Sequence, residues 1–365
     1  MAKIRDIISL IEESAPLHLQ EDFDNAGMQV GEASAEATSA LLCVDVTEAV
    51  IDEAISLGAN LVISHHPLIF KGIKSLVGKN AVERVVMNAV RNGISIYSAH
   101  TNMDSARNGV SCRMAQKLGV ANVKPLVPQK CKQVKIVTFV PNDYAEAVSA
   151  AMCASGAGNI GNYDSCSYRM MGEGSFRAKE GADPFVGAVG EVHHEPEMRI
   201  EVIAHKADKD AVVEAMMKAH PYEEPAYDVI PLLNDSPYEG LGVVGDITPM
   251  PYADFLHKLK HTFDVDAVRY CGDESRVVRR VALCGGSGAE FIVDAVRAGA
   301  DVYVTGDVKY HEFTGNAERI MIADIGHYES EQFTKDIFYE LIRKKMPNFA
   351  TYYAKSEIKQ VKFYI

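Results

Sequence analysis

The sequence predicts an α/β protein in which two related α/β lobes form one split core domain, with a βαββαβ module inserted between them. Short apolar runs alternate with amphipathic segments near both ends of the chain, which is typical of sheets built from strand–helix units. The two outer segments also share a pattern at a fixed offset. Proline-containing stretches near residues 128 and 237 bracket the middle segment, so we expect its boundaries there.

Composition narrows the classes of function. The chain has 365 residues, which predicts two or three domains, and 47% hydrophobic with 24% charged residues is typical of globular proteins. Its net charge of -13, without a basic block, argues against sequence-independent nucleic-acid binding. No apolar run approaches the ~18 residues of a membrane span. The N-terminal segment does not have the layout of a signal peptide, and the seven cysteines are scattered, so we expect reduced thiols and a cytoplasmic location.

In the first lobe, the predicted strands and helices alternate along the chain. An amphipathic helix over 3–13 ends before Pro16, and Thr47 caps a helix that runs to about residue 57. Gly119 is the expected stop of a helix ending near 118. The remaining predicted elements are strands at 41–46, 61–63 and 94–98 and a helix at 80–92.

Two adjacent histidines, His65 and His66, follow the short apolar run at 61–63. That run predicts a buried parallel strand, and open α/β sheets bind ligands at the carboxyl ends of their strands. Pro67 ends regular pairing, so both imidazoles can turn into one cleft. An isolated pair of this kind is more often part of a polar turn than of a ligand site. Other residues of the chain are needed to distinguish the two.

The middle segment predicts a ferredoxin-like order of elements. Its strands are expected at 133–140, 165–171, 199–204 and 227–230, and its helices at 143–154 and 209–219. The predicted domains are therefore core lobe 1 at 1–127, the insert at 128–235 and core lobe 2 at 236–365. His193, His194 and His205 in the insert lack ligand spacing and predict a solvated polar face.

The outer lobes echo each other. Leu42-Cys43 recurs as Leu283-Cys284, 58–59 as 299–300, and Ser64 falls on Thr305, all at one offset (283 − 42 = 305 − 64 = 241). At a different offset, His100 and Asp104 have the same spacing as His327 and Glu331, and both pairs follow an apolar strand. We infer two lobes around a pseudo-twofold axis, with both motif sets at a shared cleft.

Imidazole and carboxylate groups gather at the predicted strand ends. They suit zinc, iron, manganese or nickel, and two such ions need about four to six of these ligands. The candidates are His65, His66, His100, Asp104, His327 and Glu331.

Four motifs, at 24–31, 65–67, 306–312 and 326–331, together resemble the Nif-three-like family, whose members are labelled GTP cyclohydrolase type 2 homologues. The resemblance covers both lobes and implies a dinuclear metal protein that assembles as a toroidal homohexamer. It implies two divalent ions per chain (zinc, iron or manganese), with Glu331 as the bridge. The ligands carried over by position are His65, His66, Asp104, His327 and Glu331.

Two functions remain open. The resemblance implies a metal-dependent hydrolase in which metal-activated water is the nucleophile, His100 or His311 moves protons, and the substrate is a nucleotide or phosphorylated small molecule. The alternative is a metal-binding regulatory or storage assembly with a ligand-sensing insert. The stretch 220–225 is similar to that of PII and CutA-type modules, which tend to trimerise.

The glycine-rich stretch 285–288 lies between a predicted strand and a predicted helix. It reads either as a tight turn or as a phosphate cradle built from backbone N–H groups. Lys309, just past a strand end in the same lobe, is an expected substrate contact.

Overall fold

Two mixed sheets with related topology form the core of the protein. The computed structural model describes residues 2–130 and 132–364 and confirms the mixed α/β class. The chain divides into two compact units, Met1–Pro128 with Pro237–Ile365, and Gln129–Ser236. Among the described residues, no helix combines the length and apolar character needed to cross a membrane. The cysteines of the described part are all free of disulfides.

The first sheet contains the three strands predicted in lobe 1, running parallel, with a short strand added at each edge. The edge strands have only four and three residues, too short to give a periodic signal, and the sequence did not reveal them. In spatial order the strands are β1 (Gly27–Val30), β4 (Ser95–Ser98), β3 (Leu61–Ser64), β2 (Ala40–Cys43) and β15 (Thr351–Tyr353).

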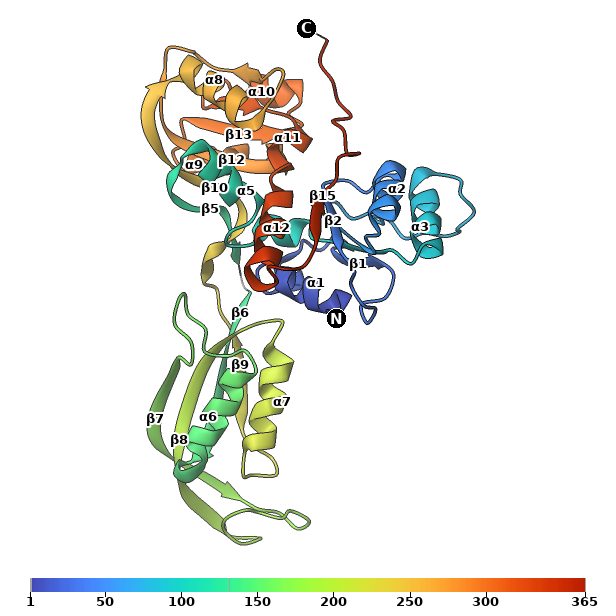
Figure 1. The fold of residues 1–365 in the computed structure, drawn as a ribbon. Helices are drawn as coiled ribbons and strands as arrows, with labels where there is room; N and C mark the ends of the chain where they lie inside the picture. Colours follow the sequence, from blue (N-terminus) through green and yellow to red (C-terminus); the bar gives the residue numbers. More distant parts are fainter. Residues whose placement is uncertain (1, 131, 365) are drawn as a thin grey trace. The chain divides into compact units, whose positions relative to one another are not determined.

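Helices cover both faces of this sheet because its strands are apolar on both sides (Figure 1). Leu42 and Ile63 pack toward α1 (Ile4–Glu12) and α12 (Thr334–Lys345), whereas the alternating Leu41 packs toward the other pair. That pair is α2 (Glu48–Leu57), capped by Thr47 as predicted, and α3 (Ala81–Arg91).

The second sheet repeats the arrangement with the strands of lobe 2, but it also takes one edge strand from residues 121–130, which were predicted to belong mostly to lobe 1. In spatial order its strands are β11 (Arg269–Cys271), β14 (Met321–Asp324), β13 (Val302–Gly306), β12 (Val277–Ser287), β10 (Asp235–Pro251) and β5 (Ala121–Lys130). Its helices include α5 (Val110–Leu118), α8 (Tyr252–Phe263), α9 (Ile292–Arg297) and α10 (Tyr310–Asn316).

The similarity between the two lobes extends to the hydrogen-bond register of their strands. Ala40 pairs with Leu61 in the first sheet, and Val281 pairs with Val302 in the second, so both partners shift by 241 (281 − 40 = 302 − 61). The third strands are offset by 226, because Leu61 faces Ser95 and Val302 faces Met321 (321 − 95).

The predicted equivalence of His100 and His327 is wrong by one position, because their offset is 227 (327 − 100). His100 is the N-cap of α4 (Thr101–Ser105), whereas His327 is the first residue of α11 (His327–Glu331). The residue that caps α11 is Gly326. The two histidines therefore start from different positions relative to their strands.

The proline-containing stretches expected to be linkers are strands instead. Prolines 125 and 128 lie in β5, which is tolerated because β5 is the edge strand of its sheet. Its neighbour β10 approaches it so closely that a Cβ on Gly240 would lie 2.2 Å from the carbonyl oxygen of Val127.

The unit 129–236 has the element order predicted for the middle segment. Its antiparallel sheet runs β7 (Ser167–Arg177), β8 (Val192–His205), β6 (Gln133–Pro141) and β9 (Tyr227–Pro231). Helices α6 (Ala145–Ala154) and α7 (Lys209–Ala219) pack side by side and bury a core with one face of the sheet (Figure 1).

Candidate metal centre

The two histidines after β3 are held by the neighbouring strand. The backbone N–H of His65 donates to the carbonyl of Cys43 at 3.2 Å, and that of His66 donates to the carbonyl of Val44 at 2.9 Å. The side chain of His65 is fully buried. The pair is therefore fixed to the carboxyl end of the parallel sheet, as the sequence predicted.

Glu331, on α11, lies at the centre of the cluster, and each of its two carboxylate oxygens lies close to a histidine ring nitrogen. Its Oε1 is 3.5 Å from Nε2 of His65, and its Oε2 is 2.9 Å from Nε2 of His66 and 3.2 Å from Nε2 of His327. The Oδ1 of Asp104 is 3.7 Å from Nε2 of His65. The structure thus brings all five residues of the predicted ligand set together.

Four histidines present the same ring nitrogen to the centre of the cluster. In each, Nδ1 lies 2.7–2.9 Å from an oxygen that can accept its proton. When the ring is neutral, such a bond fixes the tautomer in which Nε2 carries the lone pair, which is how metal-binding histidines are usually oriented. The pairs are His65 with the Ala99 carbonyl, His66 with Asp45, His100 with Asp24, and His327 with Asp307.

The charges in the cluster are strongly coupled. Burial lowers the pKa of His66, but its bonds to Asp45 and Glu331 outweigh this and raise the pKa to about 10. Burial likewise opposes protonation of His327, yet Glu331 and Asp307 raise its pKa to about 9. Burial raises the pKa of Asp104. Two closely spaced carboxylates therefore require positive charge nearby, which protons or metal ions can supply.

The residues present fit divalent metal ions. Nε2 of His65 and Oδ1 of Asp104 are buried without a hydrogen-bond partner among the described residues, a costly arrangement that coordination would relieve. In two groups of three side chains, the possible ligand atoms lie within 4.8 Å of one another, and Glu331 belongs to both groups. The first group also contains His65 and Asp104, and the second also contains His66 and His327. Glu331 would therefore be able to offer a ligand oxygen to either group.

The Duf34/NIF3 (NGG1p interacting factor 3) family profile matches residues 2–361. The chain belongs to this family. It is 39% identical to a Halalkalibacterium halodurans protein named GTP cyclohydrolase 1 type 2 homolog, over 90% of this chain and 89% of that protein. A Bacillus subtilis protein of the same name is 37% identical, over 91% and 90% of the two chains. The crystal structure of a Bacillus cereus protein related to NIF3 has a TM-score of 0.85 and 37% identity, covering 100% of this chain and 99% of that one.

In this NIF3-family chain, residues 285–287 form the end of β12 rather than a tight turn, and the phosphate-cradle alternative is also wrong. Three of its backbone N–H groups already donate to side-chain hydroxyls within the fold. A Cβ at Gly286 would lie 2.3 Å from Oε1 of Glu331, so the glycine makes room for the central carboxylate. The acceptors are Ser111, Ser330 and Thr305.

His100 and His311, the two candidate proton-transfer residues, have different surroundings. The ring centroid of His100 lies 5.3 Å from that of His65 and 5.5 Å from that of His66. His311 is exposed on α10 beside Tyr310, and it belongs to none of the ligand groups found among the described residues. Lys309 is also exposed, at the start of the same helix.

Sequence reasoning missed three aspartates that orient the histidines: Asp24, Asp45 and Asp307. A signal was present for two of them, because Asp45 and Asp307 follow the carboxyl ends of β2 and β13, just as the histidine pair follows β3. A more distant residue, Glu357, also escaped notice. Its Oε1 accepts the backbone N–H groups of Val44 and Asp45, at 2.6 and 2.9 Å, and so fixes the loop that carries Asp45.

Proposed function

We propose that this protein is a metal-dependent hydrolase with a dinuclear centre of zinc, iron or manganese, in which water is the nucleophile. The observation that supports it most directly is the position of Glu331, whose two oxygens face two separate sets of donors. When bound, a pair of divalent ions lowers the pKa of a water molecule and polarises a substrate oxygen.

The number of protein donors favours chemistry over storage. Each set offers three side chains, counting Glu331 in both, whereas a structural zinc site is usually closed by four. Coordination positions then remain for water and substrate. These open positions favour a hydrolase over a storage protein.

His100 is the residue best placed to move a proton beside the centre. Its Nδ1 is held by Asp24 at 2.8 Å, which leaves Nε2 to accept or return a proton. Burial opposes ionisation of Asp24, but bonds from His100 and Thr101 outweigh it and lower its pKa to about 2. Asp24 is therefore an anion at neutral pH, and its hydrogen bond fixes the position of the His100 ring.

We infer a nucleotide or phosphorylated small molecule as substrate. The names of the bacterial relatives support this class, since both are called GTP cyclohydrolase 1 type 2 homologs. We further propose a toroidal hexamer and a PII/CutA-like character for the insert, both supported by the sequence resemblance. A regulatory role is the second candidate, favoured by a large pocket on the unit 129–236.

The test is turnover by metal-reconstituted protein on GTP, phosphate esters and cyclic amides. Activity should require metal, disappear in Glu331→Ala and fall in His100→Gln. His193→Ala is the matched control, because His193 is bound to Glu195 in the other unit and should not matter. Activity that survives Glu331→Ala would indicate a contaminant. Metal-loaded protein without any turnover would favour the regulatory candidate.

A further inference from the structure

A pocket of about 860 Å³ lies on the unit 129–236, on the face of its sheet opposite the two helices. Alternation along β8 explains the two faces. Ile200 and Val202 are buried in the core with the helices, whereas Glu197 and Arg199 point the other way and line the pocket. The volume is within the range of small-molecule sites.

The floor of the pocket is formed by two glycines of β7. Gly172 pairs with Glu197, and Gly174 pairs with Glu195, so the two glycines share the open face. A Cβ on Gly174 would lie 2.1 Å from Oε2 of Glu197, and the missing side chain is what admits that carboxylate. A Cβ on Gly172 would meet nothing closer than 3.9 Å, so the space above it is open.

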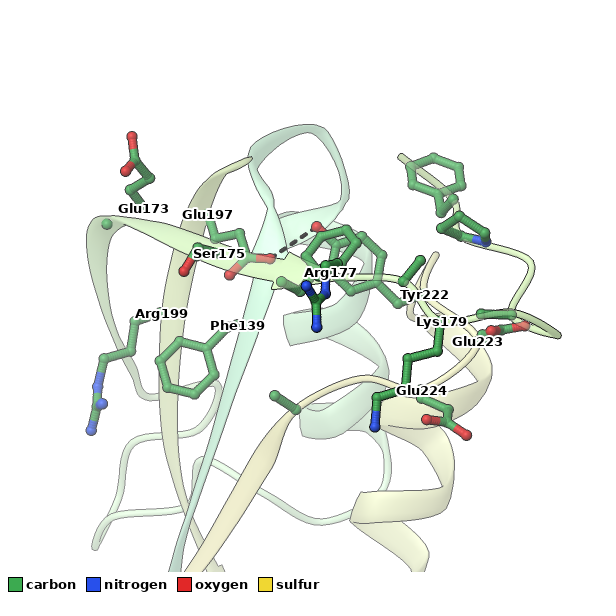
Figure 2. A pocket seen from close by; sticks show the side chains of 18 of the residues that line it. Phe139, Glu173, Ser175, Arg177, Lys179, Glu197, Arg199, Tyr222, Glu223 and Glu224 are labelled. Atoms are coloured by element: carbon green, nitrogen blue, oxygen red, sulfur yellow. Dashed lines mark hydrogen bonds between the residues drawn. The ribbon is translucent and has the colours of Figure 1, made fainter. Parts of the chain in front are cut away.

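Aromatic side chains form the walls, as Figure 2 shows for Tyr222 and Phe139. The ring centroid of Tyr222 lies 6.0 Å from that of Phe176 and 6.2 Å from that of Phe185. Aromatic rings around an open backbone floor suit a planar ligand, because such side chains can stack on the face of a flat ring system. Stacking of this kind occurs with any of the nucleic-acid bases.

The polar lining includes a buried acceptor and two cations, together with the side chains of Glu173, Ser175, Arg199, Glu223 and Glu224. Glu197 is only 8% exposed, and its Oε1 accepts the hydroxyl of Tyr222 at 2.9 Å (Figure 2). Its Oε2 has no hydrogen bond or ion pair with the residues that the structure describes. Arg177 and Lys179 also line the pocket, and neither forms an ion pair within the described part of the chain.

We propose that this pocket binds a guanine nucleotide. A carboxylate is an acceptor only, so Glu197 requires a ring edge that presents donors. Guanine offers adjacent N–H donors on its Watson–Crick edge, whereas adenine places an acceptor there. Single bases are commonly read in this way, by stacking on aromatic rings and hydrogen bonds to that edge. Arg177 and Lys179 would bind the phosphate.

The experiment is calorimetric titration of the full chain with GMP, AMP and guanosine. GMP should bind more tightly than AMP, and guanosine should bind more weakly than GMP because it lacks the phosphate. Glu197→Gln should weaken GMP binding by about ten- to one-hundred-fold, since a charge-assisted hydrogen bond is lost. Gly172→Leu fills the pocket from an unobstructed position and should abolish binding. Glu180→Gln, an exposed change outside the lining, should have no effect.

Titration of Glu331→Ala separates this site from the metal centre, and its GMP affinity should equal that of the unaltered chain. Equal affinity for GMP and AMP, or GMP binding that survives both pocket substitutions, would overturn the proposal. Absence of GMP binding together with a changed oligomeric state in Gly172→Leu would show that another copy of the chain covers this face instead.

Discussion

The two lobes of the core have corresponding strands in the same register but different residues where those strands end. After β3 come His65 and His66, and at the matching positions of β13 are Gly306 and Asp307 (306 − 65 = 307 − 66 = 241). Lobe 1 therefore contributes two histidines from the end of a strand. Lobe 2 contributes its donors one element later, from α11.

Close packing explains the difference. A Cβ on Gly306 would lie 2.8 Å from the backbone of Gly326 and His327, so only glycine lets α11 approach β13. That approach places Glu331 between the two histidines of lobe 1. A repeated scaffold can therefore yield one asymmetric site, because both lobes supply a donor from a short helix but only lobe 1 also supplies histidines from a strand end.

The largest expected effect is on metal content. Glu331→Ala removes the side chain shared by both donor sets, so we expect nearly all bound metal to be lost. Asp104→Asn alters only the set with His65, and the other set should retain its ion. Elemental analysis of purified protein measures both, with the exposed Asp266→Asn as control. Equal losses in the two variants would contradict a shared carboxylate.

A smaller effect is expected from the aspartates that orient the histidines. Asp45→Asn and Asp307→Asn should each weaken metal binding by about ten- to one-hundred-fold, because these bonds fix the tautomers of His66 and His327. Competition with a chromophoric chelator gives the affinities. If one variant binds metal as tightly as the unaltered protein, the histidines of the two lobes are not both oriented by an aspartate.

A further prediction concerns the contribution of the Asp24 carboxylate to the free energy of unfolding. Its side chain is fully buried, and its pKa falls from 3.8 to about 2 on folding, so Asp24→Asn should cost about 2 kcal/mol at pH 7. The lowered pKa means that this contribution is present above pH 3.8 and is lost as the pH falls toward about 2. Denaturant unfolding of both proteins at pH 7 and near pH 3 should show the gap narrowing. A gap independent of pH would place the cost elsewhere, for example in packing.

The smallest effect on the metal centre is expected from deleting the insert. Residues 128 and 237 lie on neighbouring strands, so a short glycine loop can join them. We predict a folded product with unchanged metal content per chain, measured by circular dichroism and elemental analysis. A metal-free or insoluble product would mean that the segment 128–235 is part of the core.

The sequence by itself determined much of this protein. The apolar runs located the three parallel strands of lobe 1 and the six main elements of the insert, because local patterns specify such elements. The placement of polar residues after strands was enough to find six candidate residues, and the family resemblance narrowed the ligand set to five by leaving out His100. The five are His65, His66, Asp104, His327 and Glu331.

Only the tertiary structure decided how those residues meet. Glu331 reaches His66 across 265 positions of the chain, and that contact depends on the glycine at 306 rather than on any local pattern. The pairing of β5 with β10, the one-residue shift of His100 and the bond from Asp24 to His100 likewise arise between distant segments. Local propensity cannot encode them, because register and packing between such segments are set only when the sheets assemble.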